Sequence, residues 1–150
     1  MVIVTTPQDV ALLDSRKSIT FANSLKVDVI GVIENMSGYT IRGKAPAGAE
    51  IELAAPGGKT VKAQADSDGN WAGTLDIFKS GGGEKTANEF NVPFLGKLPF
   101  DPGFVRGGDD GVHRIVSEPD GPSSEAFSKV VAKIQERVES GTTEGGLEII

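Results

Sequence analysis

The stretch "VIVTTPQDVALLDSRKSITFANSLKVDVIGVIENM", residues 2–36, decides the fold. It opens with the apolar run "VIVTT" and closes with a second run, "VDVIGVIENM"; continuous runs of this kind are typical of strands buried on both faces of a parallel sheet. Between them, Thr6-Pro7-Gln8-Asp9 predicts a helix start, with Thr6 as the N-cap and Pro7 at the first helical position. We therefore expect a β-α-β unit with a right-handed crossover.

The apolar residues of the predicted helix mark one of its faces, the side that normally packs against a core. They are Val10, Leu13, Phe21 and Leu25, and Lys17 interrupts the row.

Residues 76–139 continue the same α/β pattern. Ser80 to Phe90 predicts a short capped helix, and "VPFLGKLPF" at residues 92–100 predicts a third strand. A glycine-rich loop is expected next, followed by a helix from about Pro122. That helix has an apolar face at helical spacing, made of Phe127, Val130, Val131, Ile134 and Val138. Residues 140–150 are expected to form a flexible tail.

Residues 40–75 have a different texture. Ile51 and Leu53 alternate with polar residues, as do Val61, Ala63 and Ala65, and "PGGK" and "DSDGN" lie between the runs as turn sequences. This period of two predicts short antiparallel strands joined by hairpins. The fold class expected for the chain is therefore α/β: a partial, three-layer parallel sheet of about three strands with flanking helices, carrying a small antiparallel β insertion.

Composition excludes several classes of function. The 150 residues carry a net charge of -6, so we expect no nucleic-acid partner, and no apolar run is long enough to span a membrane. No signal peptide is recognisable, and a cytoplasmic location is expected. Cysteine is absent, which removes thiolate zinc sites and cysteine-ligated clusters, and the single histidine makes a histidine metal site improbable. We expect no metal ligands.

The α/β portions resemble a known family. The stretches "VIVTTPQDVALLDSRKSI", "VIGVIENMSGY", "DIFKSGGGEKTANEFNVPFLGKLPFDP" and "GGDDGVHRIVSEPDGPSSEAF" resemble the carboxy-terminal half of Mrp/ApbC-type ATPases, the iron–sulfur cluster carriers among the MinD/ParA-like P-loop proteins. They run in the family's order over residues 1–39 and 76–139. The resemblance implies ATP and an iron–sulfur cluster as the family's cofactors.

The remaining segment, residues 40–75, resembles about half of a bacterial Ig-like repeat, through "RGKAPAGAEIEL" and "DSDGNWAGTL". An Ig-like sandwich has about seven strands, and this segment supplies about four. One hypothesis is therefore that the chain is an engineered or recombined chimera.

The stretch "KSGGGEKT" invites a phosphate-loop reading, but a loop ending in Lys85-Thr86 would have glycines at positions 79 and 84. The chain has Lys79 and Glu84 there, so the glycines predict a helix-capping turn. In the family the Walker A loop lies earlier, and a Cys-x-x-Cys follows "ENMSG", where this chain has "YTIRGK". We expect neither ATP hydrolysis nor cluster carriage by this chain unaided, and no bound cofactor.

Part of the family's nucleotide pocket has counterparts here. The resemblance implies contact with the adenine by Asn35 and by the backbone of Pro99, Phe100 and Asp101. The expected partners are an amino-terminal Mrp-like half, which would complete the sheet, or a second copy of the chain. An alternative is a non-enzymatic binding or interaction module that uses the Ig-like β insertion.

Overall fold

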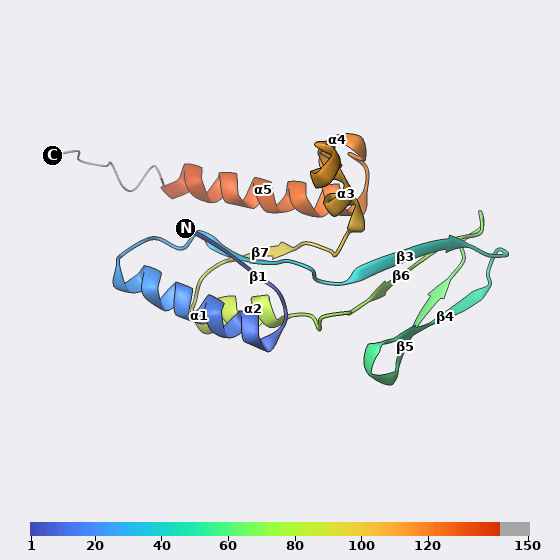
Figure 1. Ribbon diagram of the computed structural model, residues 1–150, viewed down its shortest axis with the longest axis horizontal. Coiled ribbons are helices and arrows are strands. Elements are labelled where there is room, and N and C mark those ends of the chain that lie inside the picture. Colours follow the sequence, from blue (N-terminus) through green and yellow to red (C-terminus); the bar gives the residue numbers. More distant parts are fainter. Residues whose placement is uncertain (142–150) are drawn as a thin grey trace.

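The computed structural model describes residues 1–141 and has a parallel three-stranded sheet at its centre. The strands are β1 (Val2–Thr5), β2 (Gly31–Glu34) and β7 (Phe94–Lys97), in the order β1-β2-β7. Helices α1 (Asp9–Ser24) and α2 (Gly82–Glu89) lie on one face, and α5 (Pro122–Gly141) lies on the other (Figure 1). The predicted three-layer α/β architecture is confirmed.

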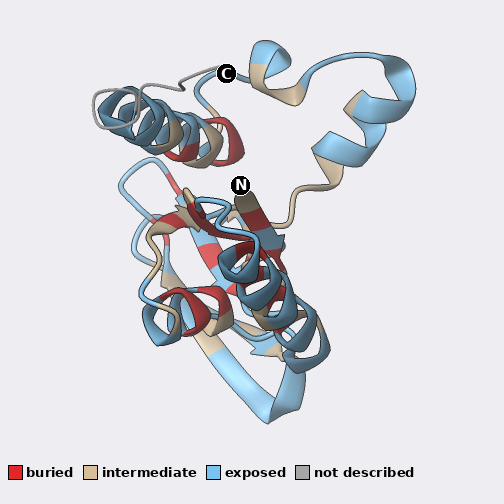
Figure 2. Ribbon diagram, turned by 90° about the vertical axis from the view of Figure 1, so that its left-hand side faces the viewer, coloured by how far each residue is buried: buried red, intermediate tan, exposed pale blue. Residues whose placement is uncertain are grey.

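The core is divided between the two faces of this sheet. On the side of α1 and α2, Ile3, Ile19 and Val32 pack with their neighbours in one cluster. On the side of α5, Ile33 and Leu95 pack against Val130. Figure 2 shows the buried residues gathered on the strands and on the helix sides that face them. Burying each of these side chains contributes about 1.5–3 kcal/mol, so the two clusters dominate the stability of the α/β part.

Two predictions about α1 are wrong. The helix begins at Asp9 with Gln8 as its N-cap, and the Thr6 hydroxyl donates to Gln8 Oε1 instead of accepting from a helix amide. The predicted apolar face is also the exposed one: Val10, Leu13, Phe21 and Leu25 are 54–75% exposed.

The buried face of α1 consists of Leu12, Ser15, Ile19 and Ala22. Two of these side chains are small, and the Ser15 hydroxyl donates to the Ala11 carbonyl of the same helix at 2.8 Å. Small side chains let the helix backbone approach the sheet closely. A search for apolar periodicity does not detect such a face, because serine is scored as polar.

The glycine-rich loop expected after residue 101 contains two helices, α3 (Pro102–Asp110) and α4 (Arg114–Ser117). Helix α3 starts with an N-cap of a common type. The Asp101 side chain accepts from the Gly103 N–H at 2.8 Å, and Pro102 occupies the first turn. Gly111 ends the helix with a φ of 69°, the left-handed conformation that glycine adopts without strain. The helix predicted from Pro122 is confirmed as α5.

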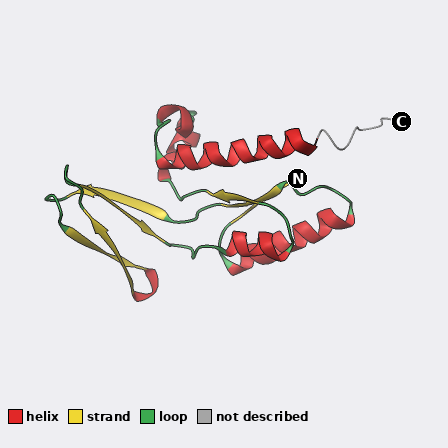
Figure 3. Ribbon diagram, turned by 180° about the vertical axis from the view of Figure 1, so that it is seen from behind, coloured by secondary structure: helices red, strands yellow, loops and turns green. Residues whose placement is uncertain are grey.

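The segment of residues 40–75 forms two antiparallel strand pairs that extend away from the parallel sheet (Figure 3). β3 (Tyr39–Lys44) pairs with β6 (Asn70–Leu75), and β4 (Glu50–Ala55) pairs with β5 (Lys59–Gln64) around a short 3-10 turn, η1 (Pro56–Gly58). The β4–β5 hairpin packs on β6 at Gly73, where a Cβ would lie 2.5 Å from Leu53 Cδ1.

Of the predicted flexible tail, Ser140 and Gly141 belong to α5, and residues 142–150 lie outside the described residues. Within residues 1–141, no helix combines the length and the apolar character that crossing a membrane requires.

Candidate functional site

The chain segments that leave β2 and β7 are tied together at the carboxyl end of the sheet. Asn35 N–H donates to the Thr5 carbonyl at 2.7 Å, and Leu98 N–H donates to the Glu34 carbonyl at 2.8 Å. Ser37 N–H in turn donates to the Leu98 carbonyl at 2.9 Å. Ligand sites of open α/β sheets lie in the crevice beyond the carboxyl ends of the strands, so these segments border the position where a site is expected.

A cavity of about 270 Å³ lies at this edge and brings together all four residues predicted from the family's nucleotide pocket: Asn35, Pro99, Phe100 and Asp101. The rest of its lining is apolar, from Met36, Leu98, Phe104, Val105 and Phe127. The sequence did not identify Phe104 and Phe127, because they lie on helices that pack together only in the folded chain; their rings are 6.3 Å apart.

Asn35 offers this cavity one polar group. Its Oδ1 accepts a hydrogen bond from the Met36 N–H at 2.9 Å, and no described residue accepts from its Nδ2. The local bond fixes the orientation of the amide, so that the NH₂ end remains available as a donor.

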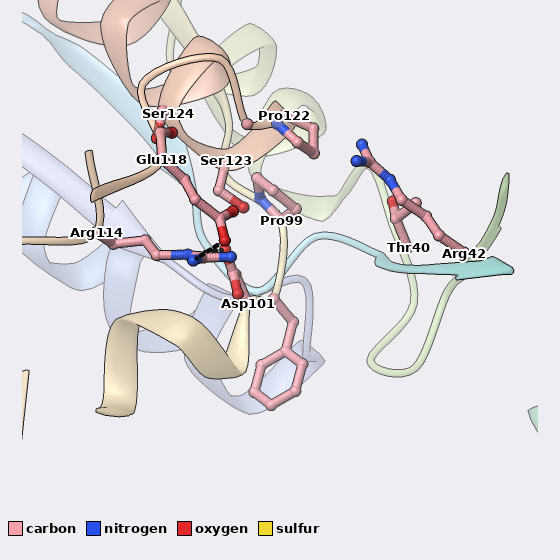
Figure 4. A pocket seen from close by; sticks show the side chains of 11 residues that line it. Thr40, Arg42, Pro99, Asp101, Arg114, Glu118, Pro122, Ser123 and Ser124 are labelled. Atoms are coloured by element: carbon pink, nitrogen blue, oxygen red, sulfur yellow. Dashed lines mark hydrogen bonds and ion pairs between the residues drawn. The ribbon is translucent and has the colours of Figure 1, made fainter. Parts of the chain in front are cut away.

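The Asp101 carboxylate is already used by the protein. Besides capping α3, it accepts from Arg114 Nε at 3.1 Å, and Arg114 Nη1 lies 2.6 Å from Glu118 Oε1 (Figure 4). Burial raises the pKa of Asp101, but hydrogen bonds from Ser123, Gly103 and Arg114 outweigh it and hold the pKa below its ordinary value. The carboxylate of Asp101 is therefore engaged by groups of the protein itself.

A second cavity, of about 270 Å³, lies on this segment and is bordered by Thr40 and Arg42 of β3. Figure 4 shows the side chains that line it. Arg114 is flanked there by Asp101 and Glu118, so its charge is neutralised within the protein.

The glycine turn before α2 holds a carboxylate of the protein itself. Glu34, fully buried at the end of β2, accepts from the Gly81 N–H at 3.0 Å and from the Gly83 N–H at 2.6 Å. Ser37 Oγ donates to the same carboxylate at 2.6 Å. Burial raises the pKa of Glu34, but these three hydrogen bonds and the charge of Lys97 lower it below its ordinary value.

The prediction of a helix-capping turn is therefore confirmed. The group that accepts from its amides is the carboxylate of Glu34, which is distant in the sequence. The sequence contained one signal for it: an acidic residue inside a buried strand needs hydrogen-bond donors. It did not show which donors, because Glu34 and Gly83 are 49 residues apart.

The "DSDGN" turn is held by the side chain of its first residue, Asp66. Asp66 Oδ1 accepts from the N–H groups of Asp68 and Asn70 at 2.9 and 2.8 Å, so the turn predicted at this sequence is confirmed. Among residues 1–141, no group of three or more histidine, aspartate or glutamate side chains is placed to hold a metal ion.

Comparison with known proteins identifies the family. The family model described as the NUBPL iron-transfer P-loop NTPases, of the ParA group, matches residues 1–61 and 65–135. This match covers most of residues 40–75. The resemblance of those residues to an Ig-like repeat, and the hypothesis that the chain is a chimera, therefore stay predictions.

Two curated relatives are both iron–sulfur cluster carrier proteins. The one from Methanococcus maripaludis is 38% identical over 138 residues, covering 92% of this chain and 38% of the relative. The one from Synechocystis sp. is 37% identical over 137 residues, covering 91% of this chain and 31% of the relative. The chain therefore spans about a third of the length of the curated relatives that it matches.

Two solved structures share the fold. The cell division ATPase MinD of Pyrococcus furiosus superimposes with a TM-score of 0.54 at 18% identity, over 90% of this chain and 41% of the other. The septum site-determining protein MinD of Pyrococcus horikoshii, complexed with Mg-ADP, gives a TM-score of 0.53 at 17% identity, over 97% and 44%. The fold, the family model and the curated relatives agree: the chain belongs to the iron-transfer P-loop NTPase family that includes the iron–sulfur cluster carrier proteins.

Proposed function

We propose that this chain supplies the base-binding side of an adenine-nucleotide site in an iron–sulfur carrier fold, and that it neither hydrolyses ATP nor carries a cluster unaided. The observation that carries the proposal is the single cavity lined by Asn35, Pro99, Phe100 and Asp101 at the carboxyl edge of the sheet.

The lining of this cavity suits a flat aromatic base. Leu98, Phe104 and Phe127 supply apolar surface, while the Asn35 Nδ2 supplies a directed donor. Ligand cavities in proteins commonly combine a mostly apolar lining with a few placed polar groups. The P. horikoshii MinD, which has the same fold, is a complex with Mg-ADP, which supports a nucleotide as the ligand.

The phosphate side is not supplied by the glycine turn. The amides of Gly81 and Gly83 that a phosphate would use are taken by Glu34, and the ammonium of Lys79 lies 2.6 Å from Asp9 Oδ2. Phosphoryl transfer depends on positioned cations and amides around the phosphates. A ligand that binds through its base alone is expected to have a Kd near 1 mM, corresponding to about 4 kcal/mol.

The chain lacks the side chains that would hold an iron–sulfur cluster. In the carriers the cluster is cargo, and iron–sulfur clusters are held mainly through cysteine thiolates. The 150 residues of this chain contain no cysteine.

Titration of adenosine and of Mg-ATP, followed by the backbone amide shifts of Asn35 and Phe100 in an NMR spectrum, tests the proposal. We expect both ligands to shift these signals at millimolar concentration. Asn35→Ala should weaken binding about tenfold, whereas Asn88→Ala, an exposed asparagine on α2, should not. Shifts confined to other parts of the chain, or no shifts at all, would contradict the proposal.

A further inference from the structure

The antiparallel strand pairs of the β insertion have two edges that carry no partner strand among the described residues. β3 pairs only with β6, and β4 pairs only with β5. Both strands have six residues, so each edge presents a row of backbone N–H and C=O groups. Edges of this kind are places where a further strand can join a sheet.

The hydrogen bonds at the end of each strand pair show which backbone groups face outward. The Ala45 N–H donates to the Gly69 carbonyl at 2.9 Å, on the β6 side of β3. The Ala65 N–H donates to the Ala49 carbonyl at 3.0 Å, on the β5 side of β4. Backbone direction alternates along a strand, so the outward N–H and C=O groups belong to the even-numbered residues. They are Thr40, Arg42 and Lys44 on β3, and Glu50, Glu52 and Ala54 on β4.

The two edges carry opposite charges. Arg42 and Lys44 are exposed on β3, whereas β4 exposes Glu50 and Glu52. Glu52 lies 3.2 Å from Lys62 of β5, in an ion pair that is open to solvent. Arg42, Lys44 and Glu50 form no ion pair within residues 1–141. Like charges on neighbouring strands destabilise the pairing, so neither edge suits a second copy of itself.

The edge of β3 is complementary to the edge of β4. Residues 45–49 join the two strands at the end of the insertion that lies away from the parallel sheet, so Lys44 and Glu50 are at a similar level (Figure 1). An antiparallel pairing that starts at this level places Lys44 beside Glu50. Two residues further on, it places Arg42 beside Glu52. The outward backbone groups of the two strands face each other in the same register.

We propose that two copies of this chain associate through these edges, with β3 of each copy paired to β4 of the other. A two-fold axis forms both pairings at once, so the assembly closes as a dimer. Each copy contributes one strand pair to each of two sheets, in which the strand order is β6-β3-β4-β5. Opposite charges select the unlike edge, and the like charges on each edge oppose the other pairings.

The inward side chains of the insertion agree with this register. A Cβ at Gly73 would lie 2.5 Å from Leu53 Cδ1, so Leu53 points into the insertion, and Ile41 lies opposite Gly73 on the neighbouring strand. The proposed pairing places Ile41 beside Leu53 of the second copy, which extends the apolar side of both sheets. Within one copy the edges are unpaired, because β3 and β4 belong to different strand pairs. The proposal does not depend on nucleotide binding in the Asn35 cavity.

Light scattering on the full chain over a range of concentrations tests the proposal. We expect the mass to rise to twice that of one chain. The amides of Arg42 and Glu52 should be protected from hydrogen exchange in the dimer and should exchange rapidly in the monomer. A chain that stays monomeric at millimolar concentration would overturn the proposal. Protection of the Arg42 amide in the monomer would also overturn it, since the edges would then pair within one chain.

Charge reversal tests the register. Lys44→Glu should weaken the dimer about tenfold, because it places a carboxylate beside Glu50 and the two-fold axis makes this contact twice. Lys59→Glu makes the same change of charge at an exposed lysine of β5, away from both edges, and should leave the dimer unchanged.

Combining Lys44→Glu with Glu50→Lys exchanges the two charges and should restore the dimer, which a mere loss of folding would not do. A dimer that Lys44→Glu leaves intact would overturn the proposal, as would a double variant that associates no better than Lys44→Glu alone.

Discussion

The carboxylate of Glu34 and the backbone N–H of Gly83 meet at 2.6 Å, although 49 residues separate them in the sequence. The contact joins the end of β2 to the first turn of α2. A helix N-terminus carries partial positive charge, so a buried carboxylate there is stabilised by the helix and satisfies its free amides. The same contact uses the amides that would otherwise make the glycine turn an anion site.

Glu34→Gln should destabilise the fold. The substitution keeps the size of the side chain but replaces a charged acceptor by a neutral one and introduces an NH₂ donor facing backbone N–H groups. Hydrogen bonds to charged groups contribute about 1.5–3 kcal/mol, and we expect a loss in that range in the free energy of unfolding. Urea denaturation measures it. Glu52→Gln, at an exposed residue of β4, is the control and should change stability little; equal stability of all three proteins would contradict the role of Glu34.

Acid should destabilise the chain through the same carboxylate. The pKa of Glu34 in the folded chain is lowered from its ordinary value of 4.5, so below that pH the unfolded chain takes up the proton first. The contribution of Glu34 is therefore fully present above pH 4.5 and is lost as the pH falls through the lowered pKa. Asp101, whose pKa is lowered from 3.8, acts in the same direction at lower pH. Denaturation measured from pH 7 to pH 3 should show the loss, and Glu34→Gln should reduce its slope.

Gly83→Ala should destabilise the chain although alanine is the better helix former. A Cβ at Gly83 would lie 2.9 Å from Glu34 Cβ, in a contact that the buried strand cannot relieve easily. Gly108→Ala, within α3, meets no atom within 4 Å and should instead stabilise by about 0.5–1 kcal/mol. Thermal unfolding of the pair gives the comparison, and a stabilising Gly83→Ala would show that the turn is looser than described.

Asp101 holds the start of α3 by two separable contacts. Asp101→Asn keeps a side chain able to accept from the Gly103 N–H but loses the ion pair with Arg114, whereas Asp101→Ala loses both. We expect Asp101→Ala to cost about 1 kcal/mol more than Asp101→Asn, the usual contribution of an N-cap. Urea titrations of the two variants give the free energies of unfolding that test this difference. Equal losses would place the whole effect in the Arg114 contact.

The strands were predictable because their signal is local. "VIVTT" and "VDVIGVIENM" are continuous apolar runs, and β1 and β2 lie within them. The fold of residues 40–75 followed from period-two alternation, which survives in β4 and β5.

The features that the sequence did not predict depend on packing or on distant partners. The buried face of α1 includes Ser15 and Ala22, whose small size matters only against the sheet. The helix α3 was missed because its three glycines outweighed the cap at Asp101 and Pro102. Asn35 and Pro99 were placed in one cavity through the family resemblance, while Phe104 and Phe127 follow only from the arrangement of α3 and α5.

The central claim is a site that holds the base of a nucleotide and not its phosphates. Its most direct test is the ratio of the Kd for adenosine to the Kd for Mg-ATP, both measured on the same sample by isothermal titration. A base-only site predicts a ratio within about threefold of one, since the phosphates gain no contact that fixes them. A Kd for Mg-ATP more than a hundredfold lower than that for adenosine would mean that the chain binds phosphates, and would contradict the account of the glycine turn.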